Sequence, residues 1–232
     1  MPESIGTWLY AITGPVADVP TGLRGVAGEP VHALPCGDLT AVVGTVGLPE
    51  FGAEAWEQAL TDSSRLGHLA RTHHEVVSAI AATTTAIPFR LATVYLGDDR
   101  VRQFVDTHRD ELHRTLRSID GRDEWGVKGY AVAPPKEPAA TASGTAYLER
   151  RRRQLARNPT GSADQVHATL AALAAAAVRD GPDVLKAAYL VDRTSAEAFA
   201  ATVRSLSGTD GLRLELTGPW AAYSFTTLRE QP

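Results

Sequence analysis

Histidine is the residue type in this sequence best suited to chemistry, because an imidazole can bind a metal or transfer a proton near neutral pH. His68, His73 and His74 share one stretch with helical hydrophobic spacing. A helical metal site needs two histidines four residues apart, so that both rings reach the same face. The separations here are five, six and one residues. We therefore predict structural or solvated histidines and no metal site.

The sequence also lacks the other motifs that would indicate catalysis. Cys36 is the only cysteine, which excludes an internal disulfide and a cysteine-based metal framework. No serine lies in a G-x-S-x-G motif, and Gly22, Gly25 and Gly28 match neither phosphate-binding glycine pattern. We predict no catalytic residue, no cofactor and no metal.

An enzyme-like alternative stays open. If His73, Arg90 and Lys128 lined one deep pocket, their side chains would suit a small-molecule-binding protein or an enzyme.

A second alternative concerns Arg150 to Arg153 with Arg157, the strongest charge feature. Consecutive helical residues point around most of the circumference, so we expect solvated arginines, with a basic patch for an acidic protein partner as the sharper hypothesis. The net charge of −4 gives no reason to expect nucleic acid.

Composition and pattern predict an ordinary globular protein with two domains. The chain has 232 residues, of which 44% are hydrophobic, and no apolar stretch is long enough to span a bilayer. We expect a soluble, cytoplasmic protein with an N-terminal domain at 1–133, a proline-rich linker at 134–143 and a C-terminal domain at 144–232.

Residue periodicity predicts the elements of the first domain. Pro35-Cys-Gly-Asp38 indicates a hairpin with glycine in its turn, between strands at 31–34 and 39–46. A helix is expected over about 52–82, followed by a strand at 86–95 in which Pro88 requires an edge position or a bulge. With a further helix ending near Ile119, this order suggests an α/β sandwich with helices on one face of the sheet.

The second domain is predicted to contain helices, a buried strand and an alternating strand. Helices are expected at 144–156, from about 160 to Gly181 and at 195–206, and strands at 184–191 and 212–216. Beyond Gly218-Pro219 stand three large rings, Trp220, Tyr223 and Phe225. We expect these rings to close the C-terminal core against the alanine-rich helix, because each aromatic ring buries a large apolar area.

Several stretches, in order, carry a resemblance to a known family. They are His73-His-Glu-Val-Val77, Ile87-Pro-Phe-Arg-Leu-Ala-Thr-Val-Tyr95, Glu124-Trp-Gly-Val-Lys128, Gly144-Thr-Ala-Tyr-Leu148, Tyr189-Leu-Val-Asp192 and Thr217-Gly-Pro-Trp-Ala-Ala-Tyr-Ser-Phe225. Together they resemble the gas vesicle protein L/F family (GvpL/GvpF). The family has Phe-Gly where this chain has Leu91-Ala92, and Pro-Pro where it has Ala221-Ala222. We expect the first difference to alter packing only.

The resemblance implies an α+β fold of two α/β-sandwich domains, the N-terminal one ferredoxin-like and the C-terminal one a modified version, joined by helices. It implies a non-enzymatic gas vesicle accessory or minor structural protein that binds the hydrophobic shell subunit and assists nucleation or assembly of the wall. Its partners would be the major shell protein and other accessory proteins, in the gas vesicle and cytoplasm, with no nucleic acid and no membrane insertion.

A subunit that lines a gas space exposes apolar surface, which a partner can cover. The candidates for that contact are the Pro88 strand, the small-residue face around 166–178 and the corner at Trp220. The predicted partner-binding residues are Val166, Leu170, Leu173, Trp220, Tyr223 and Phe225.

Overall fold

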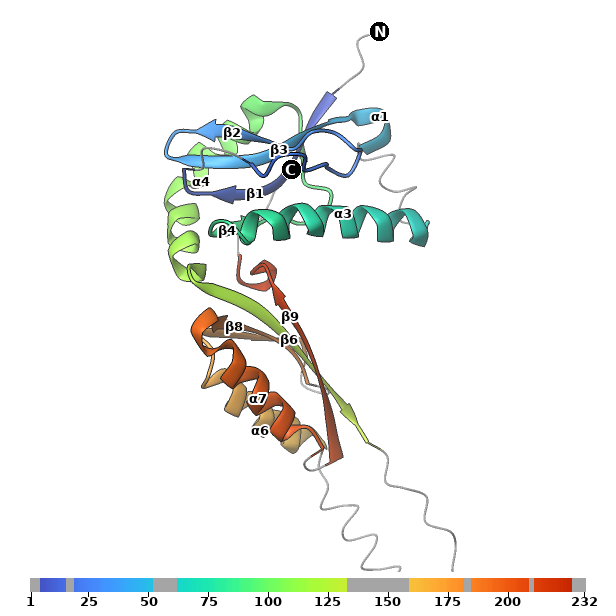
Figure 1. Cartoon of the computed structure of the whole chain (residues 1–232), viewed down its shortest axis with the longest axis vertical. Helices are drawn as coiled ribbons and strands as arrows, with labels where there is room; N and C mark the ends of the chain where they lie inside the picture. Colours follow the sequence, from blue (N-terminus) through green and yellow to red (C-terminus); the bar gives the residue numbers. More distant parts are fainter. Residues whose placement is uncertain are drawn as a thin grey trace, which may run out of the picture. The chain divides into compact units, whose positions relative to one another are not determined.

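The computed structural model divides the chain into two compact units (Figure 1). The described residues are 5–15, 19–51, 62–132, 159–181, 185–208 and 211–226. The first unit holds the described residues up to Gly121 and again from Trp220 onward, and the second unit runs from Arg122 to Pro219. The sequence-based boundaries instead assigned residues up to 133 to the first domain and all residues after 144 to the second. The structure differs because the strand after Gly121 pairs within the second unit, whereas the last turn packs on the first.

The first unit is built on an antiparallel sheet. Its strands are β1 (Ile5–Thr13), β2 (His32–Cys36), β3 (Leu39–Gly47), β4 (Ala86–Pro88) and β5 (Val94–Tyr95). The order is β2-β3-β1-β4, and β5 also pairs with β1. The predicted hairpin is confirmed, since Cys36 pairs with Leu39 and the turn is made by Gly37 with a φ of 74°. A positive φ favours glycine, which has no Cβ to clash.

The Pro88 segment forms two short edge strands rather than one continuous strand. β4 and β5 both pair with β1, and residues 89–93 interrupt them. The backbone N–H of Phe89 still donates to Tyr10 O at 2.9 Å. Ala92, in the interruption, has a φ of 68°. The expected edge position of Pro88 is confirmed, but the Leu91-Ala92 difference affects backbone conformation as well as packing, because non-glycine residues seldom adopt positive φ.

Helices cover both faces of the first sheet, whereas one covered face was expected from the sequence. The helices are α1 (Leu48–Phe51), α3 (Ser63–Ala81) and α4 (Asp98–Ile119). The side chain of Thr7 bonds to Asp98 at the start of α4, and the neighbouring Trp8 bonds to His73 of α3. Successive strand residues point to opposite faces, so α3 and α4 lie on opposite sides. β1 is accordingly buried at every position after Ile5.

Only part of the long helix predicted for 52–82 can be compared, since 52–61 lie outside the described residues. α3 begins after Asp62, whose carboxylate accepts hydrogen bonds from the N–H groups of Ser64 and Arg65 at 3.0 and 3.1 Å. This is the standard way to satisfy orphan donors at a helix start. Its buried residues, Leu69, His73, Val76, Val77 and Ile80, form the stripe that the sequence predicted.

The second unit is a four-stranded antiparallel sheet with two helices on one face (Figure 1). Its elements are β6 (Arg122–Ala131), α6 (Pro159–Ala171), β7 (Ala176–Arg179), β8 (Lys186–Asp192), α7 (Ala196–Leu206) and β9 (Leu212–Trp220), in sheet order β7-β8-β6-β9. A short 3-10 turn, Arg193–Ser195, precedes α7 and another, Tyr223–Phe225, follows β9. The core joins Val166 and Leu170 of α6, Phe199 of α7, and Val127 and Tyr189 of the sheet.

One element of the second unit differs from the prediction. The helix expected to reach Gly181 ends at Ala171, and Ala176–Arg179 forms β7 instead. Alanine is the best helix former, so the sequence pattern favoured a longer helix. Pairing with β8, from Ala176 with Leu190 to Arg179 with Ala187, overrides that local preference. The helix predicted at 144–156 lies outside the described residues.

Candidate functional site

His73 is buried in the core of the first unit rather than exposed in a pocket. Only 3% of its surface is accessible. The indole N–H of Trp8 donates to its Nδ1 at 3.1 Å, and its Nε2 lies 2.9 Å from the carbonyl oxygen of Phe89. An indole can only donate and a carbonyl can only accept, so the ring is neutral with its proton on Nε2. Burial lowers the pKa of His73 to about 4.

The residues of the enzyme-like alternative therefore have separate roles. His73 uses both ring nitrogens inside the core, which leaves none for a substrate. Arg90 is exposed between β4 and β5, and Lys128 is exposed on β6 of the second unit. The imidazole of His73 would have to leave its core bonds to act as an acid or base.

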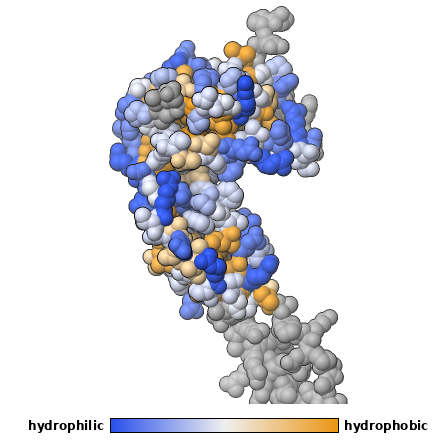
Figure 2. Space-filling model, in the orientation of Figure 1, coloured by the Kyte–Doolittle hydropathy of each residue, from blue (hydrophilic) through white to orange (hydrophobic). Residues whose placement is uncertain are grey.

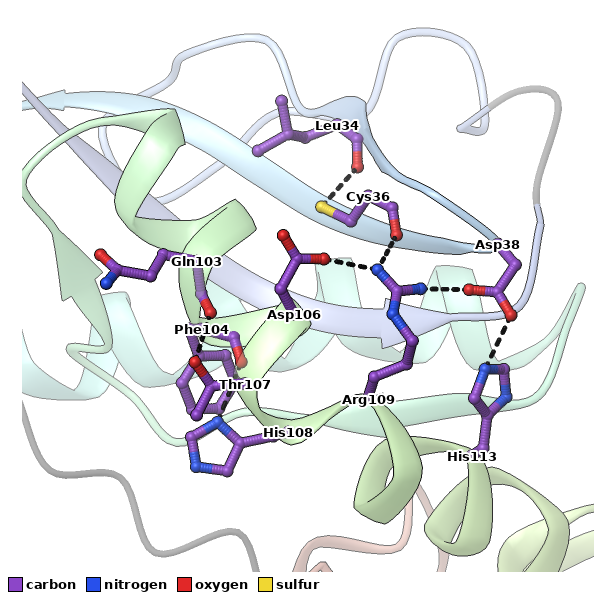
Figure 3. Close-up of polar contacts among 10 residues, drawn as sticks. All are labelled: Leu34, Cys36, Asp38, Gln103, Phe104, Asp106, Thr107, His108, Arg109 and His113. Carbon is purple, nitrogen blue, oxygen red and sulfur yellow. Dashed lines mark hydrogen bonds and ion pairs between the residues drawn. The ribbon is translucent and has the colours of Figure 1, made fainter.

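A cluster of polar side chains joins the β2–β3 turn to α4 (Figure 3). The guanidinium of Arg109 donates to the carboxylates of Asp38 and Asp106, and to the carbonyl oxygen of Cys36 at 3.2 Å. Nε2 of His113 lies 2.9 Å from the second carboxylate oxygen of Asp38. Each charged group thus faces an opposite charge or a carbonyl. The arrangement fastens a hairpin turn to a helix.

This cluster does not assemble a nucleophile with a base. The Cys36 thiol is buried and donates to the carbonyl oxygen of Leu34 at 3.4 Å, and burial raises its pKa. His113 contacts Asp38 and not the thiol, and Figure 3 shows His108 turned away toward the Phe104 carbonyl. The adjoining surface hollow, about 390 Å³, is lined only by α4 residues 106–111 and Arg114. A hollow along a single helix face does not enclose a substrate.

The aromatic corner at the chain's end packs on the first unit, which corrects the expectation that it closes the C-terminal core. Trp220 meets the ring of His74 edge-on, with centroids 4.9 Å apart, and Tyr223 lies 6.4 Å from the same ring. Tyr223 also packs against the core cluster around α3, and Ala222 is buried. His74 is held in turn by Ser78 Oγ at 3.2 Å. Figure 1 shows this last turn beside α3.

The six predicted partner-binding residues differ in accessibility. Val166 and Leu170 are buried in the second core, with 6% and 0% of their surface accessible, so they pack the protein itself. Leu173 follows α6 and is 47% accessible, and Trp220 is 42% accessible. Tyr223 and Phe225 are half-buried. Leu173 and Trp220 are thus the two most accessible members of this set.

Sequence reasoning missed a partly buried carboxylate, that of Glu29, which anchors the loop before β2. Tyr10 donates to Glu29 Oε1 at 2.6 Å and accepts from the N–H of Val26 at 2.9 Å, and Ala27 N–H donates to Glu29 Oε2 at 2.8 Å. Burial first, and then Glu29, raise the pKa of Tyr10. The sequence feature that could have indicated this contact is Gly44, because a Cβ at that position would lie 2.3 Å from Glu29 Oε1.

A second missed cluster joins α6 to the second sheet. Nδ1 of His167 lies 2.9 Å from the hydroxyl of Tyr189, and Arg179 pairs with Asp164 at 2.5 Å. Burial raises the pKa of Tyr189 to about 12, while burial followed by the nearby Arg179 lowers the pKa of His167. These residues are far apart in the sequence and follow no motif. The cluster is consistent with helix-on-sheet packing.

Across the parts of the chain that the structure describes, no group of three or more His, Cys, Asp or Glu residues could hold a metal. None of the helices in those parts is long and apolar enough to cross a membrane. On the face drawn in Figure 2, hydrophobic residues form separate patches among hydrophilic ones. The arginines at 150–153 and 157 lie outside the described residues.

The fold and the internal use of these polar groups define a two-unit α+β protein with two antiparallel sheets. A family model, "Gas vesicle synthesis protein GvpL/GvpF", matches residues 6–227. The chain belongs to this family. It is 39% identical to gas vesicle protein L of a Streptomyces species, over 97% of this chain and 94% of that protein. It is 25% identical to gas vesicle protein F2 of Halobacterium salinarum, over 79% and 80% respectively.

Solved structures share the fold. The crystal structure of gas vesicle protein GvpF from Anabaena matches with a TM-score of 0.73 at 20% identity, covering 99% of both chains. That of GvpF from Microcystis aeruginosa matches with a TM-score of 0.68 at 19% identity, covering 96% of this chain and 99% of the other. The resemblance read from the sequence is thereby confirmed, as is the α+β fold class.

Proposed function

We propose that this chain is a non-enzymatic accessory or minor structural protein of gas vesicles that binds the shell subunit and assists nucleation or assembly of the wall. Family membership supports a role in gas vesicle synthesis. One structural observation carries the rest: the imidazoles of His73 and His113 are bonded to other groups of this chain, whereas the apolar side chains of Leu173, Val178 and Trp220 remain exposed.

The physical basis is the behaviour of a wall-forming subunit in water. A polypeptide that will face a gas space exposes apolar area, which drives aggregation unless another surface covers it. A partner with exposed apolar side chains on a stably folded scaffold can cover such area and release it during assembly. The expected site of action is the gas vesicle and its assembly intermediates, and other accessory proteins are expected partners.

Co-purification with the shell subunit tests this proposal. The tagged chain is co-expressed with the shell subunit, and both the soluble and the vesicle fractions are captured on the tag. We expect the shell subunit in the captured material and not in a matched capture with an unrelated tagged protein of similar size. Absence of the shell subunit from both captured fractions would refute the proposal.

A further inference from the structure

Two glycines and two larger residues fit together where β6 pairs with β9. Gly126 of β6 lies beside Thr217 of β9, whose Oγ1 would be 2.6 Å from a Cβ at position 126. Gly218 lies on Trp125, since a Cβ at position 218 would be 3.3 Å from Cε3 of the indole. These four residues form an interlock, in which each glycine makes room for a larger residue of the opposite strand.

The two contacts of the interlock lie on opposite faces of the second sheet. Leu216 of β9 and Trp125 of β6 both pack against the core that α6 and α7 cover. Successive strand residues alternate between faces, so Gly218 meets Trp125 on the core face, and Thr217 meets Gly126 on the other face. The hydroxyl of Thr217 also donates to the carbonyl oxygen of Gly126 at 3.4 Å. The pairing of β6 with β9 is therefore constrained from both sides.

One register runs through the whole strand pair. At its far end the N–H of Val132 donates to the carbonyl oxygen of Gly211 at 2.7 Å. Counted along each strand, these two residues are six positions from Gly126 and Thr217 respectively. The hydrophobic pattern alone does not select this register, because the alternating Leu-Arg-Leu-Glu-Leu of 212–216 repeats after a slip of two residues.

The interlock excludes such slips. A Cβ at position 218 would be 2.8 Å from the carbonyl oxygen of Glu124, closer than Cβ atoms approach other atoms. Gly218 is the only glycine of β9, so a slip of one residue would bring Thr217 or Pro219 to this place. A slip of two residues, which keeps every side chain on its face, would bring a still larger side chain there. Each of these residues carries a Cβ, so each would clash with the β6 backbone.

The interlock stands close to both points where the chain passes between the units. β6 begins at Arg122, directly after Gly121 of the first unit, and the chain returns to that unit at Trp220. Trp220 is two residues beyond Gly218 and contacts the ring of His74 on α3. Each residue of slip would move Trp220 by about 3.3 Å along the strand, a large step against the 4.9 Å between the two ring centroids.

We propose that the interlock positions the C-terminal turn, Trp220–Phe225, on α3 by fixing the register of β9. The turn is placed there by its rings, because Trp220 and Tyr223 both contact the ring of His74, and Tyr223 also packs on the first core. These rings reach α3 only when β9 leaves the second sheet at the correct residue. The fit of two glycines in the second unit thereby controls how the first unit is completed.

The substitution Gly126→Ala tests this inference, because its Cβ meets Oγ1 of Thr217 and leaves every residue of the first unit unchanged. Adding Thr217→Ala removes that oxygen and should rescue the pairing. Gly129→Ala is the matched control on the same strand, since its Cβ would lie 2.9 Å from side-chain atoms of Leu185 and Leu212, away from the interlock. Hydrogen exchange of each full-length variant is measured in α3 and in α6 and α7.

We expect the α3 amides around His74 to exchange about tenfold faster or more in Gly126→Ala, and at the parental rate once Thr217→Ala is added. Gly129→Ala should speed exchange in α6 and α7 and leave α3 at the parental rate. In a Trp220→Ala background, Gly126→Ala should change α3 no further, because the ring contact is already lost. The inference is overturned if Gly126→Ala leaves α3 at the parental rate, or if Gly129→Ala speeds exchange in α3 as much.

Discussion

The indole N–H of Trp8 and Nδ1 of His73 meet at 3.1 Å in the core of the first unit, between strand β1 and helix α3. This bond works only while the imidazole is neutral, because a protonated ring has no acceptor. Protonation would also place a charge in a site that water does not reach. The stability of the first unit is thereby coupled to pH through one side chain.

Acid should weaken the fold through His73. Its pKa is about 4 in the folded protein and 6.5 for the ordinary side chain. Because the pKa of His73 is lower in the folded protein than in the unfolded chain, protonation favours the unfolded chain. The contribution of the neutral ring to the free energy of unfolding is therefore fully present above pH 6.5 and is lost as the pH falls toward 4. The loss is about 3 kcal/mol in the free energy of unfolding, measured by urea unfolding across this range. The variant His73→Gln, unfolded in parallel, should lack this contribution to the change of unfolding free energy with pH, while its carboxylates titrate as in the parent. If the unfolding free energy of parent and variant changed equally with pH, the effect could not be assigned to His73.

Ala92→Gly should stabilise the protein. Ala92 has a φ of 68°, a conformation that costs a non-glycine residue roughly 1–2 kcal/mol. Glycine removes that cost but gains freedom in the unfolded chain, so we expect a net gain of about 1 kcal/mol in chemical unfolding. Ala70→Gly, on the exposed face of α3, is the control and should destabilise by about 1 kcal/mol. A loss of stability at both positions would argue against the left-handed backbone at Ala92.

Gly44→Ala should displace Glu29, because the new Cβ would lie 2.3 Å from Glu29 Oε1. The bonds from Tyr10 and Ala27 would be lost, and we expect a cost of about 2 kcal/mol. The test is a double-mutant cycle with Glu29→Ala, followed by thermal and urea unfolding. In the Glu29→Ala background the alanine at 44 has nothing to displace and should cost little. Additive costs would show that Gly44 is required for another reason.

Trp220→Ala should destabilise the first unit and spare the second. Trp220 is 42% accessible and packs on His74, so we expect about 1–2 kcal/mol rather than the roughly 3–5 kcal/mol of a fully buried ring. Hydrogen exchange locates the effect: amide protection should fall in α3. Phe199→Ala, in the second core, should instead reduce protection in α6 and α7. Unchanged protection in α3 of the Trp220 variant would contradict the packing on His74.

Local signals in the sequence were sufficient for the features that depend on neighbouring residues. Gly37 predicted the hairpin turn, and Pro88 predicted an edge position in the sheet. The alternating leucines of 212–216 predicted a half-buried strand. Each follows from a backbone restriction or a repeat within a few residues. The ordered blocks from His73 to Phe225 were sufficient for the family.

Features that depend on distant partners were not readable. β7 is a strand because β8 lies beside it, although its alanines favour a helix. The aromatic rings after Gly218 could pack on the core of either unit, judged by residue type alone. Only the tertiary fold shows that Tyr223 packs against the core of the first unit. In the same way, Val166 and Leu170 suited either a docking face or a core, and burial assigns them to the core.

The first unit is made from two separate stretches of the sequence, and the second unit is inserted between Gly121 and Trp220. During synthesis on the ribosome, the whole inserted unit therefore emerges before the segment that completes its host. The nascent protein has a finished second unit while the α3 surface beneath Trp220 is still bare. Domains in general fold as they emerge, N-terminal first; here the unit that starts first is completed only after the inserted unit has been made.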